Sequence, residues 1–157
     1  MKVIGWILVV LAVLMWIAWG YITWLLGRVT NAGLNRAQVA ADADDMLEYM
    51  NQLRQNMEHL DMTKGHAAVI FKTPQNDMEL IYRSVVKIVD RLEAIKGMGS
   101  TSTTYQVALD DLRGTSRELE LYYHNWYMAN NIPTTYGSFL VLIIGVVILF
   151  FAYRDEY

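Results

Sequence analysis

Two long stretches of the sequence lack charged side chains and histidine, and they restrict the possible folds more than any other feature. Residues 3–26 and 137–153 contain no Asp, Glu, Lys, Arg or His. About 20 apolar residues are enough for an α-helix to cross a bilayer, because a helix satisfies its own backbone hydrogen bonds there. We therefore expect two transmembrane helices, at residues 1–26 and 133–154, and a short tail at 155–157.

The first apolar run could be mistaken for a signal peptide, because it lies near the start of the sequence. The apolar region of a signal peptide has about 7–15 residues and ends at a cleavage site of small residues. This run is longer, and it ends among the aromatic residues Trp19, Tyr21 and Trp24. We therefore expect an anchor that is not cleaved.

Aromatic side chains lie at the expected ends of both transmembrane helices. Tyr and Trp are enriched where a bilayer meets water, because their rings are apolar and carry one polar group. Pro133 suits the first turn of the second helix, where a missing N–H costs nothing. We expect five interfacial anchors, namely Tyr21, Trp24, Trp126, Tyr136 and Tyr153.

The segment between the apolar runs differs from them in charge. Residues 27–132 hold eleven Lys and Arg and fourteen Asp and Glu, which gives this segment a net charge of −3. We expect it to lie outside the membrane. Its net negative charge argues against nucleic acid as a partner, since binding to phosphates needs clustered basic side chains.

The orientation in the membrane follows from only a few basic residues. Lys2 and Arg154 lie at the two ends of the chain, and Arg28 and Arg36 follow the first apolar run. Positive charge favours the cytoplasmic side, although long translocated segments escape this rule. We expect a protein of the bacterial inner membrane, with both termini in the cytoplasm and residues 27–132 in the periplasm or outside the cell.

Two classes of chemistry are excluded by missing residue types. The chain has no cysteine, which excludes disulfides, thiol nucleophiles and thiolate metal sites. A path for ions or protons through a membrane normally carries an ionisable residue within the hydrocarbon, and neither apolar run has one. We therefore do not expect a transporter or channel.

Small residues recur at a spacing of seven in both apolar runs. Seven residues are nearly two helical turns, so each set shares one face, and small side chains let helices approach closely. The neighbour could be the other span, another copy of the chain or a different protein, and the alternative is that the spacing arises by chance. Trp16 lies deeper than the usual interfacial position and indicates a protein neighbour, unless it faces lipid. The expected packing residues are Gly5, Ala12, Trp16, Ser138, Gly145 and Ala152.

The middle segment has the periodicity of packed helices. From Val39 to Leu60, apolar side chains recur in alternating steps of four and three. Thr73 and Pro74 are typical of a helix start, and Gly97 is typical of a helix end. We expect an all-α membrane protein whose two spans enclose a helical bundle or coiled-coil-like domain of about three helices, at residues 30–64, 74–96 and 102–130.

Three helices raise a problem of topology. A chain that leaves a membrane and returns to the same face needs an even number of upright helices. Either the second helix lies across the others or tilts strongly, or the short apolar run AAVIF at residues 67–71 forms a fourth helical piece. No other expected element includes this run.

Two groups of side chains could bind a metal ion, and simpler explanations account for both. His59, Met62 and His66 are ligand types that suit copper outside the cytoplasm, but methionines in this region are better explained as core filling and the histidines as solvent-facing. Glu120 and His124 are one helical turn apart, but they lack the further ligands of a di-iron bundle. We expect no cofactor, with copper as the one candidate.

The sequence contains no phosphate-binding loop, nucleophile elbow or Ser/His/Asp arrangement, and we expect no enzymatic activity. Two residues precede the first apolar run and four follow the second, so we expect the spans and the middle segment to carry the function. The expected function is that of an accessory or scaffold subunit, which packs through its spans and docks its helical domain onto partner proteins or copies of itself. Two alternatives stay open, namely a sensor-like ligand-binding module that signals through a separate partner and a small phage-type membrane-perturbing protein.

Overall fold

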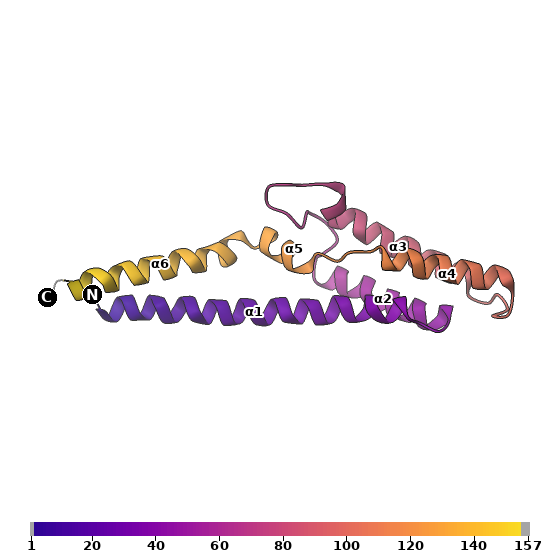
Figure 1. Cartoon of the computed structure of the whole chain (residues 1–157), viewed down its shortest axis with the longest axis horizontal. Helices are drawn as coiled ribbons and strands as arrows, with labels where there is room; N and C mark the ends of the chain where they lie inside the picture. The colour runs from indigo at the N-terminus through magenta and orange to yellow at the C-terminus, as the bar shows by residue number, and fades with distance from the viewer. Residues whose placement is uncertain (1, 155–157) are drawn as a thin grey trace. The chain divides into compact units, whose positions relative to one another are not determined.

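The computed structural model of the chain describes residues 2–154, and the regular structure in these residues is helical (Figure 1). The expectation of an all-helical chain is confirmed for this range, and the expected tail at 155–157 lies outside it. Among these residues, strand-type pairing is limited to one antiparallel bridge between His66 and Asp77. The described elements are α1 (Lys2–Gln38), α2 (Ala43–His59), the short 3-10 helix η1 (Pro74–Asn76), α3 (Met78–Ile95), α4 (Thr103–Arg117), α5 (Tyr123–Asn130) and α6 (Ile132–Arg154).

The chain divides into two compact units. The described part of unit 1 consists of residues 2–24 and 131–154, and unit 2 is Leu25–Asn130. Helix α1 therefore begins in unit 1 and ends in unit 2. Among the described helices, α1 and α6 are long and apolar enough to cross a membrane, judged by length and composition.

Helix α1 continues past the end of the apolar run as far as Gln38. From Leu26 onwards only one face of the helix is apolar. The buried residues on that face are Leu26, Thr30, Leu34 and Ala37. The hydroxyl of Thr30 donates to the carbonyl of Leu26 at 2.7 Å, which satisfies its hydrogen bonding inside the core. The structure therefore has no helix boundary between residues 26 and 30, because packing of this face stabilises the helix across the expected boundary.

The helix expected over residues 30–64 is broken at residues 39–42. Asp42 caps the start of α2, and its side-chain oxygen accepts a hydrogen bond from the backbone N–H of Asp45 at 2.8 Å. The guanidinium of Arg113 donates to two backbone carbonyls of the turn, at 2.6 and 2.8 Å. These contacts satisfy backbone groups that a continuous helix would have paired internally.

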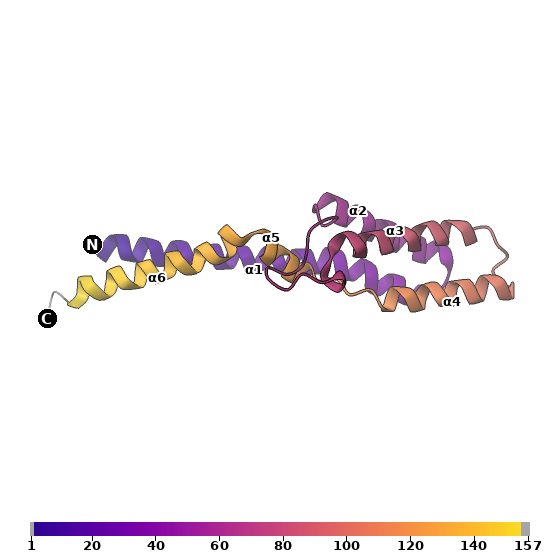
Figure 2. The same cartoon turned by 90° about the horizontal axis from the view of Figure 1, so that it is seen from above.

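Four helical segments of unit 2 run antiparallel to their neighbours in sequence, namely the last part of α1, then α2, α3 and α4 (Figures 1 and 2). The side-chain amide of Asn56 in α2 donates to the carbonyl of Val29 in α1 at 3.1 Å. The hydroxyl of Tyr82 in α3 donates to the carboxylate of Glu58 in α2 at 2.6 Å. Polar side chains thus connect successive segments of the unit.

Apolar side chains from α2, α3 and α4 fill the interior of unit 2. Helix α2 contributes three methionines, whose unbranched side chains fit irregular spaces. The apolar residues that recur along the helix expected over residues 74–96 lie on the buried face of α3. The largest fully buried side chains are Met46, Met50, Leu53, Met57, Met62, Met78, Val85, Ile88, Val89, Leu92, Leu109 and Leu112.

The last part of α1 supplies the additional helical segment that makes the number in unit 2 even. Neither a crosswise second helix nor a helical piece at residues 67–71 is therefore needed. The last part of α1 pairs with α2, so unit 2 has four antiparallel segments where three helices were expected. Helix α3 runs alongside its neighbours and does not lie across them (Figure 2). Residues 67–71 form no helix.

The start of the helix expected over residues 74–96 lies four residues later than expected. Thr73 and Pro74 begin η1, which is a single short turn. Helix α3 begins at Met78, and the carboxylate of Asp77 accepts a hydrogen bond from the backbone N–H of Glu79 at 2.9 Å. Both a Thr-Pro pair and an Asp suit a helix start, so the sequence offered two competing start signals.

The helix expected over residues 102–130 is interrupted at residues 118–122. The side-chain amide of Gln38 donates to the carbonyl of Ser116 at 3.0 Å. In an uninterrupted helix that carbonyl would accept from the backbone N–H four residues later. The Ser116 carbonyl also accepts from the backbone N–H of Leu119 at 3.4 Å. The interrupted stretch contains no Pro or Gly, so this turn bond and the tertiary contact together replace a helical bond that the local sequence permits.

Tyr105→Phe is expected to destabilise the fold. Tyr105 is buried, and its hydroxyl accepts a hydrogen bond from the backbone N–H of Ala43 at 2.8 Å. That N–H lies in the first turn of α2 and has no partner within the helix, so the variant leaves a buried donor unpaired. We expect a loss of about 1–3 kcal/mol, measured by thermal unfolding of the full chain in mild detergent.

Tyr82→Phe is the matched control for this prediction. Tyr82 donates to Glu58 at an exposed position, and this hydrogen bond raises the pKa of Tyr82. Removing an exposed bond is expected to change the stability by no more than about 0.5 kcal/mol. Equal losses in the two variants would contradict the capping role of Tyr105.

Candidate functional site: the contact between α1 and α6

Helices α1 and α6 approach each other closely in unit 1 at two glycines. A Cβ atom added at Gly145 would lie 3.1 Å from the Cβ of Leu8 and 3.2 Å from the backbone oxygen of Gly5. Both of these atoms are held by the backbone of α1 and cannot turn away. A glycine at position 145 therefore lets the two helices approach more closely than any other residue would.

The other small residues predicted to pack lie on both sides of this point. A Cβ atom at Gly5 would lie 2.7 Å from the Cγ of Leu149, which can move because it belongs to a flexible side chain. Ala12 has no exposed surface, and Ser138 is almost completely buried. Ala152 is half-buried and contributes less to the contact. Of the three neighbours that the sequence left open, the structure shows contact within one chain.

A polar contact accompanies this apolar packing. The indole N–H of Trp16 donates to the hydroxyl of Ser138 at 3.1 Å, and this hydroxyl donates to the carbonyl of Thr135 at 2.8 Å. The ring of Trp16 also lies 5.2 Å from the ring of Phe139, measured between centroids. Trp16 thus has a protein neighbour on α6, and its indole N–H has a hydrogen-bond acceptor there.

Outside this contact, the apolar side chains of the two helices are exposed. In the most apolar 18-residue window of each helix, only 11% of the residues in α1 and 17% of those in α6 are buried. Exposed side chains include Ile7, Leu14 and Ile17 of α1 and Leu140, Ile143 and Phe150 of α6. The pair thus buries one narrow face and leaves most of its apolar surface uncovered.

The predicted interfacial aromatic residues fall into two groups. Tyr21 and Trp24 are exposed, with ring centroids 5.9 Å apart, and Tyr136 and Tyr153 are exposed on α6. The ammonium group of Lys2 lies 4.4 Å from the centroid of the Tyr153 ring. The fifth predicted anchor, Trp126, is instead buried in unit 2, where its indole N–H donates to the carbonyl of Lys64 at 3.1 Å.

The side chains considered as copper ligands do not share a surface. His59 and His66 do not lie on one helix, because α2 ends at His59 and Asp61 takes a positive φ of 54°. Met62 is buried in the core, whereas the Nε2 atom of His66 lies 3.8 Å from a carboxylate oxygen of Asp77. In the described part of the chain, no three His, Asp or Glu side chains form a group that could hold a metal ion.

Glu120 and His124 do not lie on one helical turn. Glu120 falls in the interruption between α4 and α5, and His124 lies in the first turn of α5. The carboxylate of Glu120 accepts a hydrogen bond from the hydroxyl of Tyr122, and this bond raises the pKa of Tyr122. The carboxylate thus serves a local contact beside the break.

One apolar cluster was not recognised from the sequence as a candidate site. Val69, Ile70 and Phe71 are exposed on the loop that precedes α3. The sequence signal was the short apolar run that fitted no expected helix or strand. An apolar run with no place in the core is a candidate for contact with something outside the chain.

Comparison of the chain with models of protein families, with curated proteins and with solved structures gives no match. The proposals below therefore depend on the residues and contacts of this chain.

A disulfide is expected to form in a Gly5→Cys/Leu149→Cys variant. The sulfur at position 149 would replace the Leu149 Cγ, 2.7 Å from the Cβ at position 5. This is close to the separation between the Cβ of one cysteine and the sulfur of the other in a disulfide, whose S–S bond is about 2.05 Å. The chain has no cysteine of its own, so oxidation reports on this pair alone. With a protease site inserted in the exposed loop at residues 97–101, the cleaved fragments should stay joined on a denaturing gel until a reductant is added.

The matched control for the disulfide is Ile4→Cys/Leu149→Cys. Ile4 precedes Gly5, but its side chain is exposed on another face of α1. Fragments of this control should separate after cleavage without reductant. Equal joining in both variants, or links only between different chains, would contradict the contact between α1 and α6.

Gly145→Leu is expected to lower the yield of that disulfide. The added side chain would meet the Leu8 Cβ and the Gly5 backbone oxygen, and overpacking of this kind costs about 1–3 kcal/mol. The measurement is the fraction of joined fragments in the Gly5→Cys/Leu149→Cys background. Gly137→Leu is the control on the same helix, because a Cβ there meets no atom within 4 Å. An unchanged yield in Gly145→Leu would show that the two glycines do not limit the approach.

Proposed function

We propose that the chain is a non-catalytic integral membrane protein that acts as an accessory or scaffold subunit. Helix α6 and the apolar part of α1 cross the bilayer, and unit 2 lies outside the hydrocarbon. Unit 2 then docks onto partner membrane proteins or onto copies of the same chain. The observation that carries this proposal is the exposure of the apolar side chains on α1 and α6.

The amount of uncovered apolar surface supports a lipid environment. An apolar helix in the core of a soluble protein is mostly buried, whereas these windows are only 11% and 17% buried. Apolar surface left in water costs about 25 cal/mol for each Å². A bilayer removes this cost, and a helix satisfies its backbone hydrogen bonds without help from water.

The contact between α1 and α6 has the character of packing in lipid. Helices in a bilayer gain little from the hydrophobic effect when they associate, because lipid tails are as apolar as their side chains. Close backbone approach and hydrogen bonds between helices remain as the stabilising contacts. Gly5 and Gly145 supply the first, and the bond from Trp16 to Ser138 supplies the second.

Unit 2 supports a role that depends on a binding surface. Its interior is filled by Met, Leu, Ile and Val side chains. Several of its polar side chains hold the backbone in place, as Gln38, Asn56 and Arg113 do through bonds to carbonyl groups. These observations favour binding through the outer surface of the helices, and they support a scaffold over an enzyme.

Cysteine labelling tests insertion and orientation. Ser100→Cys lies in the exposed loop between α3 and α4, and Arg154→Cys lies at the end of α6. In intact cells, a maleimide that cannot cross membranes should label Ser100→Cys, and it should label Arg154→Cys only after permeabilisation. The unchanged chain has no cysteine and gives the background. Release of the chain from membranes by alkaline carbonate would contradict membrane insertion.

Cross-linking tests the docking role. A lysine-reactive cross-linker applied to native membranes should convert the chain into larger species of defined size, because unit 2 carries exposed lysines such as Lys64 and Lys96. Mass spectrometry then separates homo-oligomers from complexes with another protein. A chain that stays monomeric in membranes at its native level would overturn the scaffold proposal.

A further inference from the structure

The loop between α2 and α3 is closed at its base. The backbone N–H of Ala67 donates to the carbonyl of Asn76 at 2.7 Å, and the N–H of Met78 donates to the carbonyl of Gly65 at 2.9 Å. Gly65 has a φ of 82°, a conformation that glycine adopts without strain. The base therefore holds the two ends of the loop together.

Polar contacts also order the rest of the loop. The side chain of Asn76 donates to the carbonyl of Phe71 at 2.8 Å and accepts from the backbone N–H of Thr73 at 3.1 Å. The N–H of Lys72 donates to the carbonyl of Ile70 at 3.2 Å. The tip is thus held in one conformation by its own hydrogen bonds.

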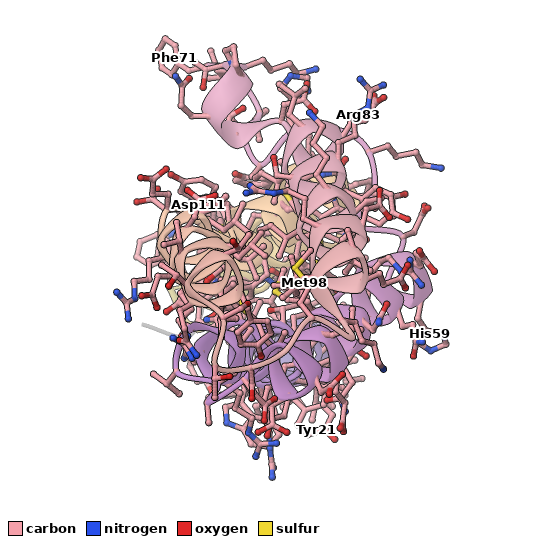
Figure 3. The ribbon with its side chains drawn as sticks, turned by 90° about the vertical axis from the view of Figure 1, so that its right-hand side faces the viewer. Tyr21, His59, Phe71, Arg83, Met98 and Asp111 are labelled. Atoms are coloured by element: carbon pink, nitrogen blue, oxygen red, sulfur yellow. The ribbon has the colours of Figure 1, made fainter. Side chains whose placement is uncertain are left out.

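This ordered tip presents three large apolar side chains to the outside. Val69 is 45% exposed, Ile70 is 78% exposed and Phe71 is 81% exposed. Figure 3 shows Phe71 at the outer edge of unit 2, pointing away from its helices. Complete burial of such a side chain is worth about 1.5–3 kcal/mol, and none of the three gains it within the chain.

The base of the loop is fastened to the helix that leads into α6. The indole N–H of Trp126 donates to the carbonyl of Lys64 at 3.1 Å, and the side-chain amide of Asn130 donates to the carbonyl of His66 at 3.3 Å. Asn130 ends α5, and α6 begins at Ile132. Within unit 2, the tip projects from the start of α3 towards the end that carries α5 (Figures 1 and 2).

We propose that Val69, Ile70 and Phe71 insert into the headgroup and upper acyl region of the bilayer that α6 enters. This inference rests on the proposed function, since it needs α6 to cross that bilayer. The hydrogen bond from Asn130 ties the base of the loop to a residue that lies two positions before the start of α6 in the chain. A bilayer that α6 enters offers the exposed tip an apolar environment.

The composition of the loop matches a bilayer interface. Aliphatic and aromatic side chains bury in the outer acyl region, while lysines extend their ammonium groups to phosphate headgroups. Lys72 follows the tip directly, and Lys64 precedes the base of the loop, and both are exposed. The ammonium group of Lys64 lies 3.3 Å from a carboxylate oxygen of Asp61, so headgroup phosphate is a partner for Lys72, while the acyl chains cover the three apolar side chains.

Fluorescence quenching in vesicles tests this contact. The full-length variant Ile70→Cys is labelled with an environment-sensitive fluorophore and reconstituted in vesicles of phosphatidylcholine and phosphatidylglycerol. Emission from the label should lie at shorter wavelength in vesicles than in protein unfolded by denaturant. Lipids with brominated acyl chains should quench this emission. Iodide in solution should quench it little. Circular dichroism of each labelled variant checks that the helices are intact.

Two control positions make each outcome decisive. Val107→Cys replaces an exposed valine on α4, and iodide but not brominated lipid should quench its label. Leu140→Cys replaces an exposed leucine on α6, and brominated lipid should quench its label if α6 crosses the bilayer. Quenching at position 140 without quenching at position 70 overturns the loop inference alone.

The remaining outcomes also separate the two proposals. If brominated lipid quenches neither the label at position 140 nor the label at position 70, both the proposed function and the loop inference are overturned. A label at Ile70 that is shielded from both iodide and brominated lipid would show that protein covers the tip. That result would replace the lipid surface with a protein partner and overturn the inference while leaving membrane insertion intact.

Discussion

The arrangement of the chain depends on a change in side-chain character along a single helix. Up to Leu26, α1 is apolar on nearly every face, and beyond it only one face is apolar. A helix that is apolar all round needs an apolar surrounding on all sides, whereas one apolar face needs only a protein core. The last part of α1 therefore packs within unit 2, while the apolar side chains of its earlier part are exposed in unit 1.

Unit 2 depends on side chains that replace helical hydrogen bonds at its breaks. Arg113 binds carbonyl groups of the turn that separates α1 from α2, and Gln38 binds a carbonyl at the end of α4. Tyr105 satisfies the first N–H of α2. Each contact joins segments far apart in sequence, so the breaks and the antiparallel packing stabilise each other. The polar side chains that bind these backbone groups therefore stabilise the fold of unit 2.

Two parts of the chain leave apolar surface uncovered, and the functional proposals depend on both. The outer faces of α1 and α6 have no cover within unit 1, and the tip at residues 69–71 has none within unit 2. The core of unit 2, in contrast, is complete. A lipid bilayer would cover both kinds of surface in the same way. The outer surface of the remaining helices is then available for protein partners.

The sequence predicted those features of the structure that depend on side-chain type alone. The two uncharged runs predicted the long apolar helices, and the recurrence of Gly5 and Gly145 picked out residues that the structure brings together. Periodicity predicted the buried face of α3 as well. These features repeat along one helix, so they can be read from local spacing.

The two breaks inside expected helices, by contrast, depend on tertiary contacts. The breaks at residues 39–42 and 118–122 lack a proline or a glycine, and apolar periodicity continues through the first of them. A helical carbonyl bonds equally well to an N–H of its own helix or to a distant Gln or Arg, so local sequence could not choose between them. The sequence by itself thus determined that the chain is helical and which faces are apolar. Only the tertiary structure decided that the expected helices break at residues 39–42 and 118–122, because the bonds from Arg113 and Gln38 join residues more than 70 positions apart.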